Sequence, residues 1–95
     1  MAAYVIFFVE RVRDAEKLAE YRRQVRQTLL DRNATIRVLH GRHEVVEGAS
    51  TGEVGMLEFP TFKEAQDWYQ SPAYQAVAAL RFAGADSRAV IVDGV

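Results

Sequence analysis

Two side chains in the C-terminal half of the sequence, Tyr74 and Arg81, have a spacing that places them on one face of a helix. Arg81 follows Tyr74 by seven residues, which is close to two helical turns. A phenol and a guanidinium that converge beside aromatic side chains suit a carboxylate or an enolate-like ligand. Together with Trp68 as an apolar wall, they form the candidate ligand-binding site. The structural alternative is that Arg81 pairs with Glu58 or a loop carbonyl and only locks its helix.

The candidate catalytic residue is a histidine. His40 and His43 lie three residues apart, a spacing that suits zinc on a helical face. Here a glycine turn separates them, so their side chains need not converge and we expect no metal site. Strand alternation aligns His40 with Ile36 and Val38, and a half-buried imidazole can act as a general base. A hydrogen-bonded structural histidine is the alternative.

A serine in the same region has a simpler explanation than nucleophilic catalysis. Ser71 precedes Pro72, and no Gly-x-Ser-x-Gly turn surrounds it. A serine immediately before a proline at the first helical position is typical of a helix N-cap. We therefore expect Ser71 to be structural.

Composition removes further classes of chemistry. The 95 residues include no cysteine, which excludes a thiol nucleophile, a disulfide and a thiolate metal site. The net charge is −1, with no glycine-rich phosphate loop and no basic stripe, so we expect neither nucleic acid nor a cofactor. The apolar run at residues 2–9 is too short for a spanning helix and lacks the preceding basic residues of a signal peptide. We expect a cytoplasmic protein without membrane contact.

The elements that must position these residues fit one domain over residues 1–95. Periodicity and turn residues predict strands at residues 3–9, 35–40, 54–59 and 88–92. Capping residues predict helices at residues 14–31, 61–69 and 71–84. Residues 43–47 resume extended character, either as one bent strand or as a small hairpin. On the first helix, Arg22, Arg23 and Arg26 fall off the apolar stripe and are predicted to face solvent.

The resulting order is β-α-β-β-α-β, an α+β, ferredoxin-like arrangement with helices on one face of a four-stranded antiparallel sheet. The first strand is apolar on both faces, so the helix-free face also needs cover. Exposed apolar patches of that kind usually mark interfaces. We therefore predict a homodimer in which two sheets pack face to face.

The C-terminal half also resembles a known family, called domain of unknown function 1330. The residues that carry the resemblance are 58–65, 68–74 and Arg81, with Glu47-Gly48 and the closing residues 92–95 in support. The resemblance covers the chain in order and implies the dimeric α/β-barrel superfamily. The family has no assigned common reaction, so whether the chain is an enzyme stays open.

Departures from the family pattern occur at three places, one of which is the loop Ala49-Ser50-Thr51, where an aromatic residue usually follows Glu-Gly. Asn33-Ala34 replaces a glycine pair, and Leu39-His40-Gly41 replaces an Arg-Gly-Gly sequence. If that arginine holds an anion in relatives, the task is lost here or has moved to Arg37 or Arg42. Two functions remain: a binder or enzyme for a small organic anion, or a non-catalytic dimeric module with a filled interior. A cavity of roughly 300 Å³ or more lined by Tyr74 and Arg81 would favour the first, and a packed-solid interior the second.

Overall fold

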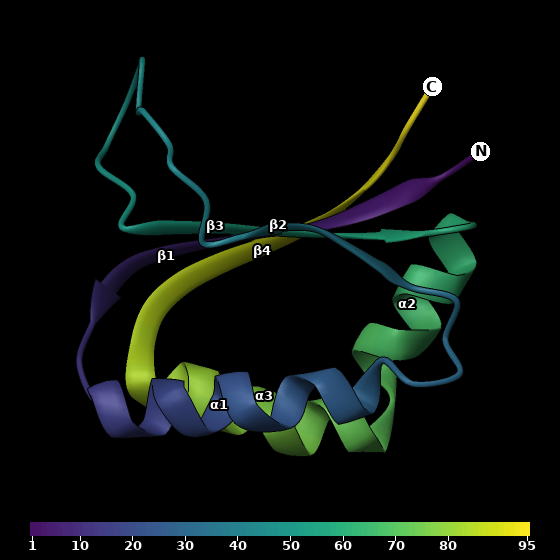
Figure 1. The fold of residues 1–95 in the computed structure, drawn as a ribbon, viewed down its shortest axis with the longest axis horizontal. Helices are drawn as coiled ribbons and strands as arrows, with labels where there is room; N and C mark the ends of the chain where they lie inside the picture. The colour runs from purple at the N-terminus through teal and green to yellow at the C-terminus, as the bar shows by residue number, and fades with distance from the viewer.

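The computed structural model describes residues 1–95 and has one sheet with all its helices on one side (Figure 1). The elements in chain order are β1 (Ala3–Val12), α1 (Ala15–Thr28), β2 (Thr35–Leu39), β3 (Glu53–Phe59), α2 (Phe62–Gln70), α3 (Pro72–Gly84) and β4 (Ala85–Asp93). The sheet has four strands in the order β2-β3-β1-β4, and every pairing is antiparallel. The predicted ferredoxin-like α+β fold is confirmed. No helix combines the length and the apolar character needed to cross a membrane.

Alternation along the central strand β1 assigns its side chains to the two faces of the sheet. Ala3, Val5 and Val9 are buried beneath the helices, where they join the core formed by α2 and α3. Tyr4, Ile6 and Phe8 point to the helix-free face, as the period of two requires. Their cross-strand neighbours there are Glu58, Met56 and Val54 on β3 and Val92, Val90 and Arg88 on β4.

Helix α1 begins at a strong cap and crosses α3 closely. The Asp14 carboxylate accepts hydrogen bonds from the backbone N–H groups of Glu16 and Lys17, which satisfies two free donors of the first turn. The backbone N–H groups of Arg13 and Asp14 both donate to the carbonyl of Gly84. A Cβ at Gly84 would lie 2.8 Å from the backbone nitrogen of Leu18, so only glycine fits this crossing.

The junction between α2 and α3 is built as the sequence predicts. The Thr61 hydroxyl accepts from the backbone N–H of Glu64 at the start of α2. Ser71 ends α2 and caps α3: its hydroxyl accepts from the backbone N–H of Tyr74 (3.2 Å) and donates to the carbonyl of Trp68 (2.7 Å). The serine hydroxyl is thus fully used in structural bonds.

Removing this hydroxyl should lower stability without affecting assembly. We expect Ser71→Ala to reduce the free energy of unfolding by about 1 kcal/mol, because the backbone N–H of Tyr74 loses its partner. The Trp68 carbonyl keeps its bond from the backbone N–H of residue 71. Urea denaturation checks the value, and size-exclusion chromatography checks the assembly. An unchanged midpoint would contradict the capping role.

Several boundaries differ from the sequence prediction. β1 runs on to Val12 and β4 begins at Ala85, because the two strands pair beyond a bulge near Glu10. Residues 43–47 form no strand but part of an irregular loop between β2 and β3. That loop rises on the side of the sheet opposite the helices (Figure 1). Helix α1 ends at Thr28, after which Asp31 and Asn33 turn the chain with positive φ angles.

Candidate functional site

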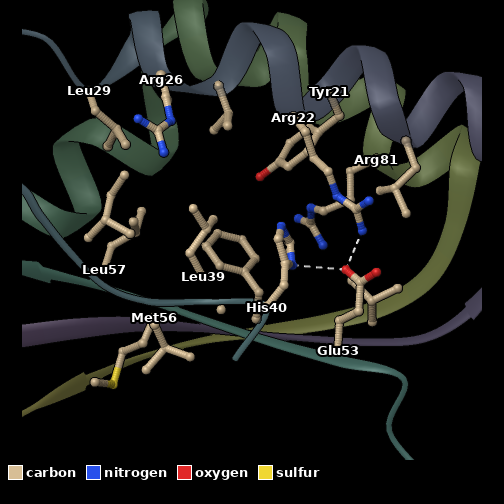
Figure 2. Close-up of a pocket in the computed structure, with 17 residues that line it drawn as sticks. Tyr21, Arg22, Arg26, Leu29, Leu39, His40, Glu53, Met56, Leu57 and Arg81 are labelled. Atoms are coloured by element: carbon tan, nitrogen blue, oxygen red, sulfur yellow. Dashed lines mark hydrogen bonds and ion pairs between the residues drawn. The ribbon is translucent and has the colours of Figure 1, made fainter. Parts of the chain in front are cut away.

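A cavity of about 330 Å³ lies between α1 and the sheet. Side chains of α1 form one wall, and strands β1, β2 and β3 form the other (Figure 2). Most of the lining is apolar, and the polar lining residues are Tyr21, Arg22, Arg26, His40, Glu53 and Arg81. The volume and the few polar groups among apolar walls are typical of a small-molecule site.

Arg81 is the buried cation of this cavity. Its side chain comes from α3, and the residue is only 3% exposed. One guanidinium nitrogen, Nη1, donates to the Ser87 hydroxyl at 2.7 Å, whereas Nε has no hydrogen-bond partner. The guanidinium carbon lies 5.1 Å from the ring centre of Phe7 and 4.9 Å from that of Phe82, so aromatic faces stabilise part of the charge. No carboxylate of the protein pairs with it.

The alternative in which Arg81 pairs with Glu58 or a loop carbonyl names the wrong partners. Glu58 pairs with Arg37 instead, at 2.9 Å between Oε1 and Nε. The hydrogen-bond partner of Arg81 is a hydroxyl rather than a loop carbonyl. A buried guanidinium without a counterion is costly, and this one lines a cavity.

Tyr21 occupies the place in the cavity that the sequence suggested for Tyr74. The two phenol oxygens lie 2.8 Å apart in a buried hydrogen bond, and only Tyr21 lines the cavity. Burial raises the pKa of both phenols above the ordinary value, and the nearby Arg81 opposes this effect at both. Both hydroxyls therefore stay protonated at neutral pH and act as hydrogen-bond partners, not as bases.

Trp68 and Tyr74 lie in the core behind the cavity, not on its surface. Both are fully buried, and their ring centres are 4.0 Å apart. The indole N–H of Trp68 donates to the Thr28 hydroxyl at the end of α1, at 3.0 Å. The expected convergence of Tyr74, Trp68 and Arg81 on a ligand is therefore corrected: of the three, Arg81 alone lines the cavity.

His40 lines the cavity beside a carboxylate. It follows β2 directly, and its Nδ1 lies 3.0 Å from Oε2 of Glu53. The same Oε2 accepts a hydrogen bond from Nη2 of Arg22. Figure 2 shows the three side chains meeting at the side of the cavity where Arg81 also lies. His43 is elsewhere, with its Nε2 2.6 Å from the Thr51 carbonyl oxygen, so the two histidines do not converge.

Two arginines that the sequence placed in solvent belong to this site. Arg22 and Arg26 line the cavity, while Arg23 pairs with Glu20 on the outer side of α1. A signal for Arg22 was present, because it follows Leu18 by four residues and so borders the buried stripe. The lining then carries three arginines against one carboxylate, in a chain whose net charge is −1. Positive charge is concentrated at the cavity.

The sequence matches the family described as Domain of unknown function (DUF1330) over residues 2–95. The protein is a member of the DUF1330 family. No curated protein matches this DUF1330 chain by sequence. The resemblance expected from residues 58–81 is thus confirmed over nearly the whole length.

Solved structures with low sequence identity share the fold of this DUF1330 protein. A protein of unknown function from Rhodopseudomonas palustris is 19% identical, with a TM-score of 0.77 over 99% of this chain and 82% of that one. A dimeric protein of unknown function with a ferredoxin-like fold, from Bacteroides fragilis, is 13% identical, with a TM-score of 0.68 over 98% and 96%. SnoaB, a cofactor-independent oxygenase from Streptomyces nogalater, is 15% identical, with a TM-score of 0.60 over 99% and 92%.

Proposed function

We propose that this DUF1330 protein binds a small organic anion in the cavity between α1 and the sheet. The observation that carries the proposal is Arg81, a buried guanidinium that lines the cavity without a carboxylate partner. An anionic group of a ligand would supply the missing counterion through charge-assisted hydrogen bonds. The apolar walls would hold the carbon skeleton of the same ligand.

The charge of the lining supports an anion rather than a cation. Arg26 has no ion-pair partner, and Arg22 shares the one carboxylate, Glu53, with His40. An entering anion therefore meets guanidinium groups on both α1 and α3. A similar fold serves a cofactor-independent oxygenase, SnoaB, which supports a small-molecule role for this architecture at the level of analogy.

The alternative, a non-catalytic module with a filled interior, fits only half of the molecule. Trp68 and Tyr74 fill the interior beneath α2 and α3, as that alternative requires. The interior beneath α1 instead holds the 330 Å³ cavity. An interior built only for stability would gain by closing such a space.

We also infer that the protein acts as a homodimer joined through the helix-free face of the sheet. Val90 and Val92 are 47% and 44% exposed there, next to the half-buried Ile6 and Phe8. A second copy would cover this apolar strip, and the Bacteroides fragilis neighbour is described as dimeric. A stable interface of this kind buries about 1,200 Å² or more in total.

The binding proposal is tested by comparing a carboxylate with its uncharged analogue. We expect phenylacetate to shift the backbone amide signals of Gly55 and Leu57, which line the cavity. Phenylacetamide, which has nearly the same shape, should bind at least about tenfold more weakly, because it lacks the charge-assisted contact. Equal affinities, or no shift with either compound, would contradict the proposal and favour the non-catalytic module.

A further inference from the structure

We propose that His40 is a general base that removes a proton from a carbon acid held in this cavity, with small 2-oxo acids carrying an apolar tail as the substrate class. The proposal rests on the proposed anion binding, since the carboxylate of such an acid would pair with Arg81. Its carbonyl makes the neighbouring C–H acidic.

The contacts of His40 assign different roles to its two nitrogens. Nδ1 faces Oε2 of Glu53 at 3.0 Å, and a carboxylate beside one nitrogen favours the tautomer that carries its proton there. Nε2 makes no hydrogen bond with the protein. In Figure 2 the ring rises from the end of β2 toward α1, with Glu53 at its side. An imidazole nitrogen without a protein partner is open to a substrate proton, as general-base catalysis requires.

The backbone at His40 is held in a conformation that is uncommon for residues with a side chain, although histidine adopts it more often than most. Its φ is +54°, in the left-handed region, which is unfavourable for most residues with a side chain. Its backbone N–H still donates to the Val54 carbonyl, at 3.3 Å, so the strand end is held in place. Strained residues of this kind occur often at functional sites.

The other titratable groups around the cavity are less free than His40 to act as the base. The raised pKa of Tyr21, caused mainly by burial, keeps its phenol protonated. The Oε2 atom of Glu53 is already shared by Arg22 and His40. The remaining lining groups, Arg26 and Arg81, are cations. His40 is therefore the only lining residue with an imidazole, and no protein group occupies its Nε2.

The step is a proton transfer that needs no oxidant or cofactor. The C–H bond beside the carbonyl breaks, its proton goes to Nε2, and its electron pair becomes a C=C bond. The carbonyl electrons move onto oxygen, which gives an enolate whose negative charge the guanidinium groups offset. Return of the proton from Nε2 to oxygen gives the enol, and its return to carbon regenerates the keto acid. The net reaction is tautomerisation, accompanied by exchange of the carbon-bound proton with solvent.

The test uses phenylpyruvate as the probe, in D₂O, with binding and exchange measured on the same sample by NMR. We expect the protein to bind phenylpyruvate and to speed exchange of its C3 protons above the buffer rate. His40→Asn should reduce the exchange rate by about 100-fold or more while affinity changes little. Asparagine tolerates a positive φ, so the turn should persist. His43→Asn is the matched control, because His43 lies outside the cavity, and it should leave the rate unchanged.

A second variant separates loss of the base from damage to the fold. His40→Gly also fits the positive φ, and added imidazole should restore part of its exchange rate. Retained exchange in His40→Asn, or binding without exchange in the wild type, would overturn the catalytic inference and leave anion binding intact. Failure of phenylpyruvate to bind would contradict the proposed function itself.

Discussion

Replacing Arg81 with methionine should weaken the binding of phenylacetate at least tenfold without loss of stability. The charge-assisted contact contributes about 1.5–3 kcal/mol, which corresponds to roughly ten- to 150-fold in affinity. The free energy of unfolding should stay within about 1 kcal/mol or rise, because a buried cation without a counterion is replaced by an apolar side chain of similar length. Isothermal titration calorimetry and urea denaturation on the same samples measure the two effects.

Two further substitutions make the Arg81 result specific. Arg81→Lys keeps the charge but loses the planar fork of donors, so it should bind more weakly than the wild type and remain folded. Arg26→Met removes an arginine at the exposed side of the same cavity and should weaken binding only a few-fold, since solvent screens its charge. If both Arg81 variants instead lost stability and bound phenylacetate normally, Arg81 would be a structural residue.

Placing aspartate at Ile6 should convert the proposed dimer into a monomer. Ile6 lies at the centre of β1 on the helix-free face, opposite Met56 and Val90. In the proposed dimer its side chain would be buried between two sheets, where an unpaired carboxylate costs several kcal/mol. Light scattering at micromolar concentration should give the dimer mass for the wild type and the monomer mass for Ile6→Asp. Stability should fall together with the dimer.

A matched control makes the same substitution away from the sheet. Leu30 is 69% exposed in the turn after α1, so Leu30→Asp should leave the mass of the assembly unchanged. A wild-type protein with the monomer mass, or an Ile6→Asp variant with the dimer mass, would contradict the proposed interface.

The order of elements could be predicted because each carries a local signal. The capping residues Thr61 and Ser71 begin their helices where expected, and alternation identifies the middle of each strand. Residues 85–87, which the sequence did not predict as part of the last strand, show where local signals fail. Ala-Asp-Ser has little strand propensity, and these residues are extended because they pair with β1 and because Arg13 contacts Asp86 at 2.8 Å. Such contacts between residues distant in sequence leave no local pattern.

The site could be predicted only in part, for a related reason. His40 was singled out because it continues the apolar strand face of Ile36 and Val38, and Arg81 because its spacing places it on the helix face of Tyr74. Tyr74 shares a helix face with Arg81, but that face extends over both the core and the cavity, and spacing cannot tell the two apart. Tyr21 and Glu53 line the cavity because α1 stands away from the sheet, which depends on how α1 crosses α3. Periodicity within α1 contains no information about that crossing.

Helix α1 covers the cavity and is held in place by contacts at each of its two ends. At its start the backbone rests on Gly84, and at its end Thr28 accepts the indole N–H of Trp68. Neither support lines the cavity, yet together they set the distance between its two walls. A substitution at Trp68 or Gly84 would therefore change which ligand sizes fit, even though neither residue lies on the cavity surface. Loss of binding in variants at these positions would therefore indicate a changed distance between α1 and the sheet. It would not be evidence that Trp68 or Gly84 contacts the ligand.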